Sequence, residues 1–190
     1  AALRNNLGNK VAQAGSLVDA DHLRFDFSHD GAVAGERLAD IESEVNEIIR
    51  SNFEVGCEEM PYKDALATGA LAFFGEKYGE TVRVVRMGDY SVELCGGTHV
   101  ERTGDIGMLE LAGESAVAAG TRRLEARSGG VALAAVRERD RMLAELAKVL
   151  GSSQAALPGR VAGLVAKVAQ LERDAARAGH VPPDVTFEDR

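Results

Sequence analysis

Apolar and polar positions at the start of the chain follow a pattern that predicts two strands. Residues 10–18 and 22–28 flank a short polar turn, Asp-Ala-Asp. In the second segment apolar side chains alternate with charged ones, and this period of two indicates a strand with one buried face. The residues of that face are Leu23, Phe25 and Phe27. Residues 1–7 predict the end of a helix that stops at Gly8.

The clearest helical pattern covers residues 35–51. Apolar residues recur three and four positions apart on one side, and glutamates occupy the other. Further strands are predicted at residues 53–60, 81–88, 90–95, 105–112 and 121–127. Pro61 predicts the start of a short helix between the first two of these strands. Together the patterns predict an α+β body, with a mostly antiparallel sheet and packed helices.

The pattern changes at Gly129–Gly130, where two long helices are predicted. They cover residues 131–150 and 160–177, with a loop between them. Apolar residues of the second helix alternate three and four apart, which is typical of a short helix–helix seam: Val161, Leu164, Val168, Leu171 and Ala175. We therefore expect a two-helix antiparallel hairpin. Residues 178–190 are polar and contain prolines, and we expect a loose tail.

Composition narrows the class of protein. The chain has 190 residues, of which 45% are hydrophobic and 27% charged, values typical of a soluble globular protein. It has no stretch as apolar as a membrane span, and we expect no signal peptide. Two cysteines give no disulfide framework, so a reducing cytoplasm is expected.

Charge argues against general nucleic-acid binding, because the net charge is −8. It is unevenly spread, however. Residues 1–128 carry −9, whereas residues 129–177 carry +3. A local contact between the basic helices and RNA therefore remains open.

The segment SVELCGGTHV, residues 91–100, contains the candidate chemistry. Cys95 and His99 are sulfur and nitrogen donors of the kinds that zinc binds, and two glycines between them permit a tight turn. Two donors do not complete a zinc site, so an ordinary loop with a half-buried cysteine explains the spacing equally well. His22 and His29 could complete a site, although nothing in their spacing requires it.

Four segments in register resemble the editing region of alanyl-tRNA synthetases: VAQAGSLVDADHLRFDFSH, GALAFFGEKYGETVRVVRMG, SVELCGGTHV and ESAVAAGTRRLEA. The resemblance covers about residues 1–128. It implies an editing domain at 1–128 that lacks its N-terminal part, a helical hairpin linker at 129–177 and the tail at 178–190. On this basis we expect the chain to be a fragment.

The resemblance also implies a function for particular residues. Editing domains of this family hydrolyse alanine tRNA that is mischarged with serine or glycine, at a zinc site. Cys95 and His99 match two zinc ligands, and the other two, a His-x-x-x-His pair, are expected upstream of Ala1. Gln13 matches a glutamine of the editing pocket, and we expect Gly96, Gly97 and Thr98 to shape that pocket. ATP is used only by the aminoacylation domain, which is absent here.

Several alternatives stay open. Arg122 and Arg123, like Arg83 and Arg86, could face tRNA phosphates, although strand arginines often meet solvent or pair with glutamate. Cys57 has acidic neighbours that disfavour a thiolate. The chain could also be a free-standing editing deacylase, or a metal-free relic that binds tRNA or a protein partner. We expect neither a membrane nor DNA as a partner.

Overall fold

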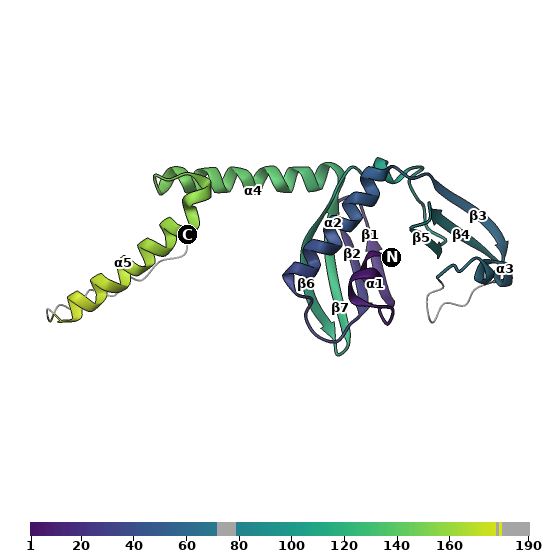
Figure 1. Ribbon diagram of the computed structural model, residues 1–190, viewed down its shortest axis with the longest axis horizontal. Coiled ribbons are helices and arrows are strands. Elements are labelled where there is room, and N and C mark those ends of the chain that lie inside the picture. Colours follow the sequence, from purple (N-terminus) through teal and green to yellow (C-terminus); the bar gives the residue numbers. More distant parts are fainter. Residues whose placement is uncertain (72–78, 178, 180–190) are drawn as a thin grey trace. The chain divides into compact units, whose positions relative to one another are not determined.

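Two antiparallel sheets with helices packed on them form the first of two structural units, residues 1–135, and residues 136–190 form the second. The computed structural model describes residues 1–71, 79–177 and 179 (Figure 1). The predicted α+β class with antiparallel strand pairing is confirmed, although the strands divide between two sheets. The predicted tail at 178–190 lies almost wholly outside the described residues.

The larger sheet has four strands in the order β1-β2-β7-β6. All three strand pairs are antiparallel. Leu23, Phe25 and Phe27 of β2 point to the side of the sheet that carries the core, as their alternation predicts, and Phe27 is fully buried. The bounds are β1 Gln13–Val18, β2 Leu23–Ser28, β6 Leu109–Ala118 and β7 Thr121–Ser128.

Helices α1 (Ala2–Leu7) and α2 (Gly35–Ser51) pack on the larger sheet and close its core (Figure 1). The predicted helix at 35–51 matches α2 residue for residue. It ends where Asn52 adopts a left-handed backbone with φ of 52°. The core cluster joins both helices to the sheet and contains Ala2, Val11, Phe27, Val33, Ile41 and Leu124.

The smaller sheet has three antiparallel strands in the order β3-β4-β5. One face packs against the short helix α3 (Tyr62–Ala67), which begins directly after Pro61. The buried cluster on that face contains Ala65, Ala70, Val82, Val84 and Leu94. The strand bounds are β3 Val55–Pro61, β4 Thr81–Met87 and β5 Ser91–Leu94.

The predicted strand at 105–112 begins later than expected. Thr103–Ile106 form a 3₁₀ turn, η1, and β6 starts only at Leu109. Tertiary contacts stabilise the turn, because the Thr103 hydroxyl donates to the Ile48 carbonyl at 2.8 Å and accepts the Phe53 N–H at 2.9 Å. A hydroxyl held by the end of α2, about fifty residues earlier in the chain, cannot be recognised from local spacing.

Two long helices follow, α4 (Gly129–Val149) and α5 (Leu157–Arg177), close to the predicted ranges. The loop between them is shorter than predicted, because residues 154–156 form a 3₁₀ turn, η2, and α5 begins at Leu157. The apolar seam predicted on α5 is not buried against another helix in the part of the chain that the structure describes. Its exposed members are Val161, Leu164, Val168 and Leu171, with exposures of 36–58%.

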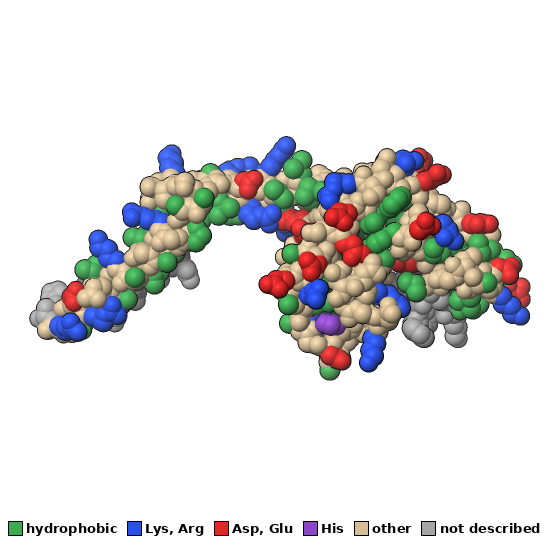
Figure 2. All heavy atoms as spheres, in the orientation of Figure 1, with side chains coloured by type: hydrophobic (Ala, Val, Ile, Leu, Met, Phe, Trp, Pro, Cys, Tyr) green, Lys and Arg blue, Asp and Glu red, His purple; other side chains and the backbone are tan. Residues whose placement is uncertain are grey.

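Surface character also differs between the units. Figure 2 shows apolar side chains along the surface of the long helices and many acidic side chains on the first unit. No described helix is both long enough and apolar enough to span a membrane.

Candidate functional site

The Cys95–His99 segment leaves the smaller sheet at the end of β5. The Cys95 N–H donates to the Arg83 carbonyl at 3.1 Å, which extends the β4–β5 pairing by one residue. Leu94 faces the buried cluster, so strand alternation places Cys95 on the opposite face. Cys95 and His99 are half-buried, whereas the three residues between them are exposed.

The guanidinium of Arg83 contacts this segment and the outer strand β3. Nη1 donates to the Gly97 carbonyl at 2.7 Å. Nη2 lies 3.2 Å from the Cys57 Sγ and 3.5 Å from the His99 Nδ1. The hydrogen bond to Cys57 is the main cause that raises the pKa of Arg83, with smaller contributions from nearby Cys95 and Glu59.

The donor types at Cys95 and His99 fit zinc, but their number does not complete a site. No group of three or more His, Cys, Asp and Glu residues that could hold a metal ion occurs among the described residues. The two other candidate histidines have different partners. His22 Nδ1 lies 2.9 Å from Asp19 Oδ2 in the β1–β2 turn, and the His29 ring stacks on Phe27 at 6.3 Å.

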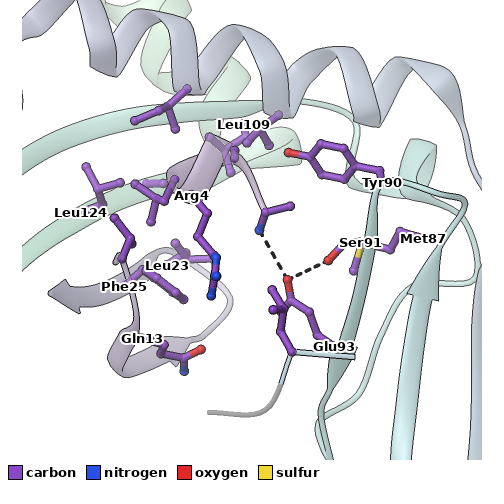
Figure 3. A pocket seen from close by; sticks show the side chains of 18 of the residues that line it. Arg4, Gln13, Leu23, Phe25, Met87, Tyr90, Ser91, Glu93, Leu109 and Leu124 are labelled. Carbon is purple, nitrogen blue, oxygen red and sulfur yellow. Dashed lines mark hydrogen bonds and ion pairs between the residues drawn. The ribbon is translucent and has the colours of Figure 1, made fainter. Parts of the chain in front are cut away.

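A cavity of about 420 Å³ lies between the larger sheet with its helices and the smaller sheet (Figure 3). Gln13, expected to line an editing pocket, is one of its wall residues. Its amide also donates to the Ser16 hydroxyl at 3.0 Å. Most of the wall is apolar, and it includes Leu23, Phe25, Ile41, Val45, Leu111 and Leu124. A mainly apolar hollow with a few polar groups is the usual form of a small-molecule site.

Polar groups enter this cavity from the smaller sheet and from α1. Glu93 is the one acidic residue among the described residues of the wall, and its Oε1 accepts the Ser91 hydroxyl at 2.7 Å (Figure 3). The same oxygen lies 3.4 Å from the backbone nitrogen of Ala1. Arg4 supplies a cationic side chain to the wall. Sequence patterns did not mark Glu93, although it lies two residues before Cys95.

A hydrogen-bonded clamp borders the cavity at Tyr90. The phenol donates to Glu44 Oε1 of α2 at 2.8 Å. The Glu44 carboxylate also accepts the side-chain amides of Asn5 and Asn6, each at 2.6 Å. Burial first, and the bond to Glu44 second, raise the pKa of Tyr90 well above its usual range.

One face of the smaller sheet connects the cavity to the Cys/His segment. Ser91 and Glu93 line the cavity, and side chains two apart on a strand share a face. Cys95 continues this series, and Arg83 lies directly across from it on β4. The structure thus brings Gln13 and Glu93 to one cavity. Cys95, Gly96, Gly97, Thr98 and His99 are not among the described residues that line it.

The arginines considered for RNA contact in β7 are both paired with carboxylates. Arg122 forms a two-pronged ion pair with Glu114, and this pairing lowers the pKa of Glu114. Arg123 does the same with Asp26, at 2.7 and 2.8 Å. Contact of either arginine with tRNA stays a prediction.

Comparison with known proteins identifies similar sequences. The family described as "Threonyl and Alanyl tRNA synthetase second additional domain" matches residues 82–125. The chain is 51% identical over 175 residues to an alanine–tRNA ligase of Pseudoalteromonas translucida (strain TAC 125), covering 92% of this chain and 20% of the relative. The alanine–tRNA ligase of Paramagnetospirillum magneticum (strain ATCC 700264 / AMB-1) is 52% identical over 176 residues, 93% of this chain and 20% of the relative. The chain thus spans about a fifth of the length of these curated relatives.

Proposed function

The chain belongs, over the region that it covers, to the alanine–tRNA ligase family, and we propose that it supplies part of an editing site. The proposed reaction is hydrolysis of the ester that joins serine or glycine to alanine tRNA. A pocket that accepts alanine cannot strongly reject glycine, which is smaller, or serine, which adds one hydroxyl. A second, hydrolytic site corrects such errors.

One observation carries the proposal. The sheet face that bears Cys95 also carries Ser91 and Glu93 on the wall of the 420 Å³ cavity, and Gln13 lines the same cavity. An aminoacyl group bound there would meet a mostly apolar wall that includes the Glu93 carboxylate and the Gln13 side-chain amide. The carboxylate can accept hydrogen bonds from the ammonium of a misattached amino acid, and the amide can exchange a hydrogen bond with its hydroxyl.

Cys95 and His99 are the proposed zinc ligands. Both are donors that zinc accepts, and they are two of the usual four. The resemblance implies that the other two ligands come from a segment outside this chain. We therefore expect the isolated chain to bind less than one equivalent of zinc and to leave seryl-tRNA intact. Robust hydrolysis by the isolated chain, or one full equivalent of tightly bound zinc, would contradict this expectation.

A chimera tests the function directly. This segment would replace the matching fifth of the P. translucida alanine–tRNA ligase, and hydrolysis of seryl-tRNA(Ala) would be measured. We expect hydrolysis by the chimera, and a loss of at least about tenfold in Cys95→Ala and His99→Ala variants. His22→Ala, a turn histidine paired with Asp19, is the matched control and should hydrolyse normally.

Attachment of alanine to tRNA by each chimera shows that the rest of the enzyme is folded. If the chimera attaches alanine but does not hydrolyse seryl-tRNA, the proposed function is wrong. If Cys95→Ala and His99→Ala hydrolyse as fast as the unmodified chimera, the roles of these two residues are wrong.

A further inference from the structure

We propose that Arg83 is the positioning residue of the Cys95–His99 loop: its guanidinium holds the loop against strand β3 and so orients the Cys95 and His99 side chains. The inference deepens the proposed function and rests on it, because orientation of these side chains matters only if they serve the site. It adds a residue on another strand, twelve positions before the motif, which the motif itself does not contain.

The strand register places Arg83 where it can do this. Val82 and Val84 face the buried cluster with Leu94, so Arg83 points to the opposite face of β4. The Cys95 N–H donates to the Arg83 carbonyl. The backbone of Arg83 therefore holds the first residue of the loop, and its side chain reaches the rest.

The side chain contacts the loop at its middle residue, Gly97, and at its last residue, His99. Nη1 holds the Gly97 carbonyl at 2.7 Å, and Nη2 lies 3.5 Å from His99 Nδ1. The second anchor is Cys57 Sγ on β3, 3.2 Å from Nη2. A planar guanidinium has several donors in a fixed arrangement, so one side chain can hold these groups in one geometry.

The loop needs such a contact because its own packing is sparse. A Cβ added to Gly96 would meet no atom within 4 Å, and one added to Gly97 would meet only Cys95 Sγ, at 3.6 Å. Residues 96–98 are exposed and belong to no helix or strand. Glycines have the largest conformational freedom to lose on ordering, so an external hydrogen bond decides how this segment lies.

The Arg83 contact also constrains the His99 ring. Nη2 lies 3.5 Å from Nδ1, so the Nδ1 edge of the ring faces Arg83 in this structure.

Nitrogen-15 relaxation of the 190-residue chain tests the inference without any activity. We expect backbone order parameters above about 0.8 for residues 96–99 in the wild type, and below about 0.6 in Arg83→Met. Arg83→Lys should lie between them, because one ammonium can hold Gly97 but cannot also bridge to Cys57. Arg86→Met is the matched control. Arg86 is an exposed arginine on the same strand, and its side chain lies on the face of the sheet opposite to that of Arg83.

Wild-type order parameters in Arg83→Met would overturn the proposal. The amide signals of Val82 and Val84 show whether Arg83→Met is folded. If it is not, the Arg83→Lys variant is used to test the proposal. A folded lysine variant with full wild-type loop order would then overturn it. In the chimera, we expect Arg83→Met to lower kcat for seryl-tRNA several-fold, with partial recovery in Arg83→Lys. A chimera that hydrolyses no seryl-tRNA contradicts the proposed function. The relaxation measurement on the 190-residue chain still tests the role of Arg83 independently.

Discussion

Removal of the Glu44 carboxylate should loosen the wall of the cavity and destabilise the first unit. Glu44 lies on α2 and accepts hydrogen bonds from Tyr90, in the turn between β4 and β5, and from Asn5 and Asn6 of α1. It therefore connects three separate elements. Arg4 and Tyr90 belong to the cavity wall, so the same carboxylate stabilises the candidate site.

The magnitude follows from these three donors. A hydrogen bond to a charged group contributes roughly 1.5–3 kcal/mol when it is sheltered from water. Here Asn5 is exposed, the other donors are half-buried, and all three share one carboxylate, so their contributions do not add. We expect Glu44→Ala to lower the free energy of unfolding by about 2 kcal/mol. Glu44→Gln keeps one carbonyl acceptor and should lose about half as much.

The pH dependence gives a second signature. The pKa of Tyr90 is raised in the folded state, from an ordinary value of 10.0. The unfolded chain therefore loses this proton first as the pH rises. The contribution of Tyr90 to stability is complete below about pH 10 and declines above it. Because Glu44 is the second cause of the shift, Glu44→Ala should weaken this alkaline decline.

Urea unfolding, followed by circular dichroism at pH 7 and pH 10.5, measures both effects. Glu47→Ala is the matched control, since Glu47 is an exposed glutamate on the same helix, and it should change stability by less than about 0.5 kcal/mol. A Glu44→Ala midpoint equal to that of Glu47→Ala would refute the reasoning, because the clamp would then contribute nothing measurable.

Two further predictions concern the larger sheet. Phe27→Ala should lower the free energy of unfolding by about 3–5 kcal/mol in urea, because Phe27 is fully buried; a loss below about 1 kcal/mol would contradict its place in the core. The hydrogen bonds from Arg123 lower the pKa of Asp26 below 3.8, so its contribution is present above that value and is lost as the pH falls. Asp26→Asn should therefore make the urea midpoint less sensitive to acid between pH 5 and pH 3, whereas exposed Asp89→Asn should leave it unchanged.

Local periodicity explains which elements were predicted well. The alternation of β2 and the helical spacing of α2 are properties of consecutive residues, and both elements have the expected buried face. The turn at η1 was missed because its stability comes from Thr103, whose hydroxyl contacts Ile48 and Phe53. These partners are about fifty residues away, so no local window contains them.

In the candidate site, too, some residues could be predicted from the sequence and others could not. Cys95, His99 and Gln13 could be selected from the sequence, through donor chemistry and through resemblance to a family. Glu93 and Arg83 could not, because a strand carboxylate and a strand arginine have no distinctive local pattern. Glu93 lines the cavity because the two sheets lie on either side of it. Arg83 lies opposite Cys95 because β4 pairs with β5.

The helical region shows where a correct local pattern leaves packing undecided. Apolar spacing identified α4 and α5, because helix formation depends on neighbouring residues. It did not determine what covers the stripe, whose side chains are exposed among the described residues. The sequence by itself thus determined most of the helices and strands, the donor chemistry of Cys95 and His99 and the family. Tertiary structure alone decided which residues face the cavity and which hold the loop, because those contacts join segments that are distant along the chain.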